Sequence, residues 1–309
     1  MALSNLMFSN PQISDSRLIM IFLYELFSWN IRIIFLEVGV IVMDVRVAIL
    51  GTRGSIPVSA ESYLRYGGAT TCVFLRFGDQ IIVLDCGTGM MELPKVLHKN
   101  DRQITVLLSH PHVDHLLGLP MCPAVFDPAK RIDIYGAVRR GMDVRQQVCT
   151  LLAPPLWPVG PDKFPAEITF RELPERMILG DVTVESMDGV HPGGVSLFRL
   201  TGGGKTVVLM TDCTVTEENI PVFAEFARDC DLLLCDGQYS LQEWKGREHF
   251  GHSTWVAAAQ LGAACGAKQV RIVHHDPFRT DAQLDSAARE LTELHGNCTF
   301  AQAGEEILL

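Results

Sequence analysis

The stretch Ser109–His115 reads Ser-His-Pro-His-Val-Asp-His, and it places three imidazoles and one carboxylate in one short segment. It directly follows the apolar run Ile104–Leu108, which predicts a buried strand. A strand that ends in such a segment delivers nitrogen and oxygen ligands from a single turn. These ligand types suit zinc or a similar borderline divalent ion. The segment therefore predicts a metal site rather than a solvated histidine-rich loop.

Other parts of the chain repeat this arrangement of an apolar strand followed by a metal-ligating residue type. Three further predicted strands end this way: Val182–Val190 before His191, Thr206–Met210 before Asp212, and Gln269–Val273 before the pair His274-His275. A lone histidine at a strand end is usually structural. Because these follow the cluster Ser109–His115 along the same chain, we expect them to join it in one site.

The order of the predicted elements indicates the fold class. Strands outnumber helices in the first half of the chain, and the two alternate in the second half, which fits two sheets packed face to face with helices outside, an αββα sandwich. The other predicted strands are Val45–Leu50, Thr71–Phe77, Gln80–Leu84, Ile132–Tyr135, Ile168–Leu173, Ser196–Leu200 and Leu232–Cys235. The predicted helices are Met90–His98, Val138–Leu151, Glu217–Arg228, Ser253–Cys265 and Asp281–Leu294. We expect one hydrolase-like domain from Met43 to Leu309.

Composition limits the partners and the compartment. The chain has 309 residues, 48% of them hydrophobic, and a formal net charge of −10, which argues against a polyanionic partner held by a broad basic surface. It has nine cysteines but no Cys-x-x-Cys pair, which predicts buried thiols in a cytoplasmic protein. Cys213 lies next to Asp212, so ligation by its thiol stays open.

Residues 1–42 differ from the rest. The segment Leu18–Val42 is very apolar, but Glu25, Arg32 and Glu37 interrupt it, so it is a poor membrane-spanning helix and a poor signal peptide. We expect an N-terminal extension of doubtful status without stable membrane association, and a membrane-associated helix is the alternative.

The spacing His-x-His-x-Asp-His from His110 to His115, together with the later strand ends, resembles the metallo-β-lactamase superfamily. This resemblance implies an αββα sandwich with two metal ions in one mouth. It implies one metal held by His110, His112 and His191, a second held by Asp114, His115 and His274, and Asp212 bridging both. Asp85 matches the aspartate that orients ligand imidazoles in this family. His274 is preferred to His275 because the family's ligand lies three residues before the proline, here Pro277.

The downstream segments Leu233–Tyr239 and Phe250–Thr254 look like the RNase Z-like branch, and the upstream segments Gly51–Pro57, Tyr66–Thr71 and Asp85–Gly89 resemble RNase Z-like or cyclic-phosphodiesterase-like hydrolases. In that branch a carboxylate–histidine pair helps to protonate the leaving alkoxide of a phosphodiester. Asp236 and His252 occupy the matching positions. The alternative is that His252 caps the helix that begins near Ser253.

The resemblance implies a dinuclear metal-dependent hydrolase that uses a metal-bound hydroxide, with Asp114 beside the water as a candidate proton acceptor. We expect Zn²⁺, with Mn²⁺ as the alternative, and a small phosphodiester or cyclic nucleotide as substrate. A tRNA 3′ endonuclease is a rival, but Asp127–Gly180 offers no basic arm. A lactone or carboxylic-ester hydrolase is the second rival. Trp157 could stack on a base or pack in a homodimer interface.

Overall fold

The computed structural model describes residues 44–294 and 296–309, which belong to the compact unit Met43–Leu309. The expectation about residues 1–42 lies outside the described residues.

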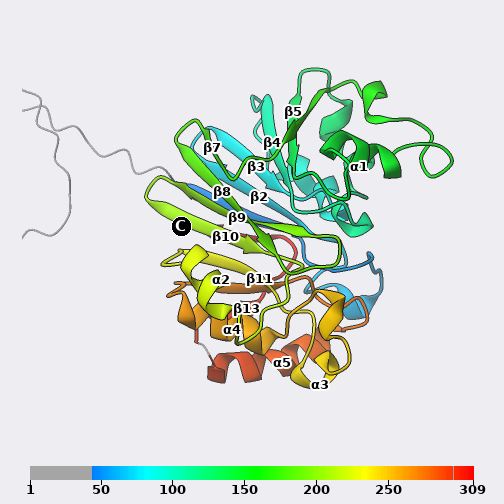
Figure 1. Cartoon of the computed structure of the whole chain (residues 1–309). Helices are drawn as coiled ribbons and strands as arrows, with labels where there is room; N and C mark the ends of the chain where they lie inside the picture. The colour runs from blue at the N-terminus through cyan, green and yellow to red at the C-terminus, as the bar shows by residue number, and fades with distance from the viewer. Residues whose placement is uncertain (1–43, 295) are drawn as a thin grey trace, which may run out of the picture. The chain divides into compact units, whose positions relative to one another are not determined.

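Two seven-stranded sheets face each other (Figure 1). The first has the order β14 (Glu305–Leu308), β1 (Val45–Gly51), β2 (Cys72–Phe77), β3 (Gln80–Leu84), β4 (Gln103–Leu108), β5 (Arg131–Gly136) and β6 (Glu167–Glu172). The second has the order β13 (Cys298–Phe300), β12 (Val270–Val273), β11 (Leu232–Asp236), β10 (Lys205–Met210), β9 (Val195–Gly202), β8 (Val182–Gly189) and β7 (Arg176–Leu179).

Alternation along the strands creates the layers. In β1, Val45, Val47 and Ile49 join the apolar cluster between the two sheets, whereas Ala48 and Leu50 join the cluster on the outer face of the first sheet. Successive side chains of a strand point to opposite faces, so a strand that is apolar at nearly every position is buried on both sides. The apolar runs therefore predict central strands covered on both faces.

Helices cover the two outer faces. On the first sheet, α1 (Val144–Leu151) packs against β5 and β6, and the 3₁₀ helix Thr88–Lys95 packs against β1 and β2. On the second sheet, α4 (Trp255–Ala264) packs on β11 and β12. Its neighbours are α2 (Ile220–Phe226) and α5 (Asp281–Leu294), and all three lie together below the strands in Figure 1. The predicted αββα sandwich is confirmed.

Several predicted helices have different bounds. The helix expected over Val138–Leu151 begins only at Val144, because Arg140 and Gly141 adopt positive φ in a turn and Asp143 then caps α1 through the backbone of Gln146. The segment expected to be helical over Met90–His98 is the 3₁₀ helix Thr88–Lys95, which contains Pro94. The strands β7, β13 and β14 and the short helix α3 (Leu241–Trp244) were not expected.

The strand directions bring the polar strand ends together. β3, β4 and β5 are parallel neighbours in the first sheet, as are β10, β11 and β12 in the second. Carboxyl ends of parallel strands share one edge of a sheet, which is where ligands bind in open α/β sheets. The residues that follow β4, β10, β11 and β12 therefore meet at one mouth.

The cysteines test one further expectation. All nine cysteines lie in the described residues as free thiols, and all but Cys149 are buried. Within residues 44–294 and 296–309, no helix is both long enough and apolar enough to cross a membrane.

Candidate metal centre

Most of the predicted site residues come from the end of a strand or the turn that follows it, whereas His252 lies in the segment before α4. His110 follows β4, and the 3₁₀ helix Val113–His115 carries Asp114 and His115. His191 follows β8, Asp212 follows β10, Asp236 ends β11 and His274 follows β12. The structure thus draws the site from both sheets.

His110, His112 and His191 form the first group. Each offers one ring nitrogen within 4.8 Å of the others, and Nε2 of His191 lies 3.1 Å from Nδ1 of His112. His110 is buried, His191 is half-buried and His112 is exposed. This group therefore forms the solvent-facing side of the centre.

Asp114, His115, Asp212 and His274 form the second group, and all four are buried. Nε2 of His274 lies 3.1 Å from Asp114 Oδ2 and 3.1 Å from Asp212 Oδ1. Nε2 of His115 lies 3.1 Å from Asp212 Oδ2. Asp212 Oδ1 is also 3.9 Å from His110 Nε2, so this carboxylate lies between the two groups.

The chemistry of this cluster fits a divalent cation. Nε2 of His110 and Nε2 of His115 are buried without a hydrogen-bond partner among the described residues, which is costly unless an ion takes their lone pairs. Burial alone would raise the pKa of Asp212, but His274, His115 and His110 hold it well below its usual range. The buried carboxylates therefore require positive charge, and imidazole nitrogen with carboxylate oxygen suits a divalent metal.

The hydrogen bonds around the cluster orient its imidazoles. Nδ1 of His115 donates to Asp85 Oδ2 at 2.8 Å, and Asp85 also accepts from the backbone and the hydroxyl of Ser109 at 2.7 and 2.8 Å. Nδ1 of His191 donates to the carbonyl of Gly251 at 2.9 Å. In both rings this leaves Nε2 free to face the centre, which is the usual way in which a protein fixes a ligand tautomer.

Backbone strain gathers at the same place. Asp85, Asp212 and His274 have φ values of 63°, 51° and 61°, in the left-handed region that non-glycine residues rarely adopt. Such conformations persist only where the surroundings enforce them, and they concentrate at functional sites.

Asp236 and His252 lie next to the second group. Nδ1 of His252 donates to Asp236 Oδ2 at 2.8 Å, and Asp236 Oδ1 accepts from the backbone of Ser253 at 2.9 Å. The ring of His252 stacks on His274, with 4.8 Å between centroids. The alternative that His252 caps α4 is wrong, because the cap is Thr254, whose side chain accepts from the backbone of Ala257.

His274 and His275 are adjacent in the sequence but have different surroundings in the structure. His274 faces Asp114 and Asp212, whereas Nε2 of His275 donates to the carbonyl of Ala301 at 2.8 Å. Burial lowers the pKa of His275 to about 3, so it is a neutral interior histidine. Cys213 does not belong to either group of candidate ligands. Burial raises the pKa of its thiol to about 12.

Sequence reasoning missed the contribution of the loop Gly51–Pro57. The backbone N–H of Ser55, a residue with φ of 65°, donates to Asp114 Oδ2 at 2.7 Å. The backbone N–H of Gly54 donates to the carbonyl of His275 at 3.0 Å. The only signal in the sequence is a glycine-containing loop after a strand, because a backbone donor has no residue type.

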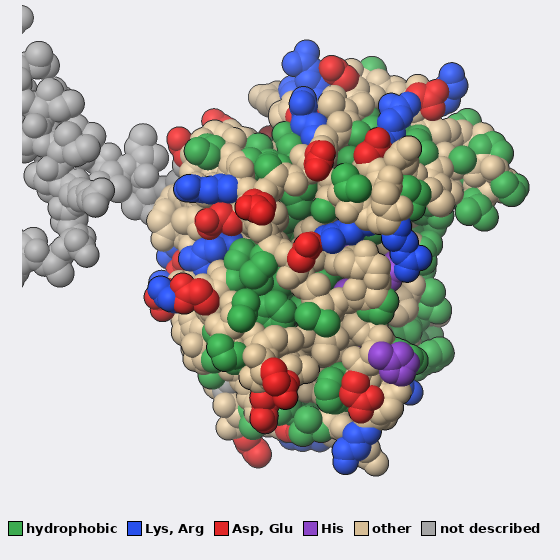
Figure 2. All heavy atoms as spheres, viewed as in Figure 1, with side chains coloured by type: hydrophobic (Ala, Val, Ile, Leu, Met, Phe, Trp, Pro, Cys, Tyr) green, Lys and Arg blue, Asp and Glu red, His purple; other side chains and the backbone are tan. Residues whose placement is uncertain are grey.

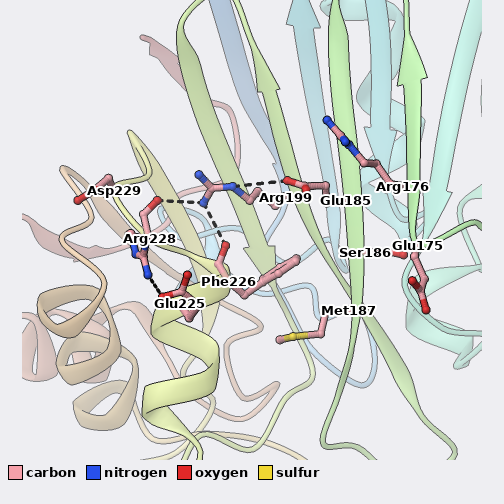
Figure 3. Close-up of a pocket in the computed structure, with 10 residues that line it drawn as sticks. All are labelled: Glu175, Arg176, Glu185, Ser186, Met187, Arg199, Glu225, Phe226, Arg228 and Asp229. Atoms are coloured by element: carbon pink, nitrogen blue, oxygen red, sulfur yellow. Dashed lines mark hydrogen bonds and ion pairs between the residues drawn. The ribbon is translucent and has the colours of Figure 1, made fainter.

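A separate hollow of about 680 Å³ lies between the second sheet and α2 (Figure 3). Its main cation, Arg199, is already engaged, since Nη1 donates to the carbonyls of Phe226 and Arg228 at 3.0 Å each. The lining residues are Glu175, Arg176, Glu185, Ser186, Met187, Arg199, Glu225, Phe226, Arg228 and Asp229. None of the predicted site residues is among them, so this hollow is distinct from the metal centre.

Comparisons with known proteins agree with this geometry. YhfI of Bacillus subtilis (strain 168), named as a probable metallo-hydrolase, is 23% identical over 271 residues, which cover 84% of this chain and 98% of YhfI. Its crystal structure has a TM-score of 0.66 at 20% identity and covers 86% of this chain and 100% of that one. A ribonuclease Z of Natronomonas pharaonis is 23% identical over 298 residues, which cover 79% of this chain and 93% of the relative.

A structure described as a diphosphatase from the PhnP family has a TM-score of 0.61 at 14% identity, and covers 85% of this chain and 97% of that one. The model of the β-lactamase superfamily domain matches residues 80–275, more than half of the chain. The match begins at β3 and ends at His275, so it includes all the strand ends that form the centre. The chain therefore belongs to the β-lactamase superfamily, and it is a metal-dependent hydrolase with the metallo-β-lactamase fold.

Proposed function

We propose that the protein is a dinuclear phosphodiesterase that acts on a small phosphodiester, such as a cyclic nucleotide. The observation that carries this proposal is the Asp236–His252 pair, 2.8 Å apart and stacked against His274. Hydrolysis of an unactivated phosphodiester needs a proton for the leaving alkoxide, and this pair offers one beside the metal ligands.

In this proposal one ion would be held by His110, His112 and His191 and the other by Asp114, His115 and His274, and Asp212 would serve both. Two such ions, Zn²⁺ or Mn²⁺, would supply an activated water and neutralise the nonbridging oxygens of the phosphodiester. Ser55 and Asp85 keep Asp114 and His115 in place through their hydrogen bonds. Asp114 is positioned to accept the proton of the attacking water.

The orientation of His252 gives it the complementary role. Its Nδ1–H donates to Asp236, so a proton carried on Nε2 can pass to the leaving oxygen. Asp236 holds the direction of the ring. In this proposal the acid is His252 and the base is Asp114.

A ribonuclease Z activity is the second candidate, since a relative of that name covers most of the chain. The segment where a basic arm is expected contains a loop between α1 and β6 that extends outward in Figure 1. Its exposed side chains include the apolar Leu156 and Val159. On the face in Figure 2, acidic and basic side chains are interspersed. Both observations favour a small substrate over tRNA.

One panel of substrates tests the proposal. The purified protein, loaded with Zn²⁺ or Mn²⁺, is assayed on bis(p-nitrophenyl) phosphate, a cyclic nucleotide, a lactone and a precursor tRNA. We expect turnover of the first two. Hydrolysis of the lactone alone, or of the precursor tRNA alone, would contradict the proposed function.

A further inference from the structure

Two arginines form a hairpin that the proposed mechanism does not use. Arg139 and Met142 exchange both backbone hydrogen bonds, at 3.0 and 2.9 Å, between β5 and α1. The two residues between them, Arg140 and Gly141, have φ values of 50° and 74°. Positive φ at both central positions is characteristic of a type I′ turn, which fixes the direction of its side chains.

This hairpin lies against the loop that carries His191. The backbone N–H of Gly194 donates to the carbonyl of His191 at 2.9 Å, which closes that loop. A Cβ atom on Gly194 would lie 2.6 Å from Arg139 Nη1, and one on Gly193 would lie 3.7 Å from both Nε and Nη2 of Arg140. Both guanidinium groups therefore border the loop that follows His191. On the face in Figure 2, Lys or Arg side chains lie beside a small histidine surface.

The two guanidinium groups differ in their partners. Nη2 of Arg139 donates to Asp188 Oδ1 and to Ser196 Oγ, each at 2.8 Å, so this residue anchors the hairpin. Arg140 is exposed, and among residues 44–294 and 296–309 its side chain has neither a hydrogen-bond nor an ion-pair partner. A cation without a charged partner thus lies beside the loop that follows His191, in a chain whose net charge is −10.

The backbone of Arg140 is also unusual. Asn, Asp and Gly are the favoured residues at the first central position of a type I′ turn, and Arg is not. In the part of the chain that the structure describes, six non-glycine residues have positive φ. Besides Arg140, four of them belong to the centre or hydrogen-bond to it: Ser55, Asp85, Asp212 and His274. Since the side chain of Arg140 makes no polar contact in the fold, its strained placement points to a ligand.

We propose that Arg140 is an anion subsite, and that the natural substrate carries a second phosphate besides the phosphodiester that is cleaved. This inference rests on the proposed phosphodiesterase function. A guanidinium group presents two parallel N–H donors that match two oxygens of a phosphate. The guanidinium group of Arg140 would bind the second phosphate, while the metal centre would bind the phosphodiester that is cleaved.

A pair of substrates with the same leaving group tests this. The p-nitrophenyl ester of thymidine 5′-phosphate is compared with the same ester that also carries a 3′-phosphate. For the wild-type protein we expect a higher kcat/KM for the 3′-phosphorylated ester, through a lower KM. In Arg140→Asn that preference should fall about tenfold or more, because a hydrogen bond to a charged group is lost.

We expect Arg140→Asn to fold normally, because Asn is favoured at this position of the turn. The melting temperature of this variant should therefore not fall. Arg140→Lys should keep part of the preference, since it retains the charge but not the paired donors. Arg289→Ala, on the exposed face of α5, is the matched control and should keep all of it. Equal kcat/KM for the two esters in the wild type, or an unchanged preference in Arg140→Asn, would overturn the subsite while the phosphodiesterase function stands. If neither ester is cleaved, the proposed function fails and this inference fails with it.

Discussion

At the scale of single residues, the contact between His252 and Asp236 decides what the imidazole can do. Nδ1 points to the carboxylate, so only Nε2 can face a substrate. Asp236 is itself held by the backbone of Ser253 and of Gln238, at 2.9 and 3.1 Å. The pair is therefore rigid in the absence of substrate, which favours proton transfer over a merely structural role.

Replacing His252 with Ala should distinguish these roles. We expect kcat to fall about 10²–10⁴-fold for a phosphodiester with an alkoxide leaving group, the usual contribution of general acid catalysis. A p-nitrophenolate needs little protonation, so bis(p-nitrophenyl) phosphate should lose much less. Asp236→Asn should show the same pattern more weakly, and His249→Ala, an exposed neighbour, should show no effect. Equal losses on both leaving groups, with metal content intact, would mean that His252 is structural.

His274 and His275 should also separate by substitution. His274→Ala should lower metal content and activity together, because its Nε2 faces Asp114 and Asp212. His275→Ala should retain the metal but lose roughly 1–3 kcal/mol of stability, because the buried carbonyl of Ala301 loses its donor. Elemental analysis and thermal unfolding of both variants check this, and the reverse pattern would exchange the two roles.

Residue types explain why much of this cluster could be read from the sequence. Histidine and aspartate at several strand ends follow the cluster Ser109–His115 along the chain, so His110, Asp212 and His274 were expected near one another. The backbone N–H of Ser55 and the free guanidinium of Arg140 could not be expected in the same way. A backbone N–H is present in almost every residue, so the sequence does not show which one contacts the centre. The role of an arginine depends on which loop lies beside it in the fold.

At the scale of elements, the loop Gly51–Pro57 links the two sheets at the metal centre. It leaves β1 and contacts Asp114 through Ser55, and it contacts the segment after β12 through Gly54. Its Arg53 is fully buried, and Nη1 donates to the carbonyls of Asp276 and Arg279 at 3.0 and 2.7 Å. The loop therefore holds the polypeptide that directly follows His274.

Gly54→Ala should disturb this arrangement. A Cβ atom there would lie 2.3 Å from Cε1 and Nδ1 of His274, so the ring must move. We expect metal affinity to fall about 10–100-fold, as when the support of a metal ligand is lost. Competition with a chromogenic chelator measures this. Gly296→Ala is the control, since a Cβ there meets no atom within 4 Å, and equal affinity in both variants would contradict the role of the loop.

The elements differ in how far the sequence predicts them. Central strands such as β3 and β4 are continuous apolar runs, so their positions were predicted closely. The short strands β7 and β13 have four and three residues, too few for a period to emerge. The predicted start of α1, at Val138, was wrong because the turn that precedes the helix has Arg140, not glycine or asparagine, in its first central position.

At the scale of the whole molecule, the proposed ligands lie where strand ends of the two sheets meet. His110 and Asp114 follow a strand of the first sheet, while His191, Asp212 and His274 follow strands of the second. The αββα order was predictable because buried strands and outer helices follow from apolar patterning. How the two sheets face each other depends on contacts between distant segments, such as Gly54 with His275, that local patterns do not contain.

Removal of the metal should therefore destabilise the entire sandwich. An ion that binds only the folded state, at about 1,000 times its Kd, adds about 4 kcal/mol to the free energy of unfolding. For a domain of this size that corresponds to roughly 8–16 °C in Tm. Elemental analysis of the purified protein should give close to two ions per chain, and a chelator should then lower Tm by about this amount. Asp212→Asn should bind fewer ions and respond less to the chelator, because its carboxylate lies between both groups. A chelator that strips the ions without moving Tm would show that the sandwich is held by its apolar layers alone, and that the metal serves only the reaction.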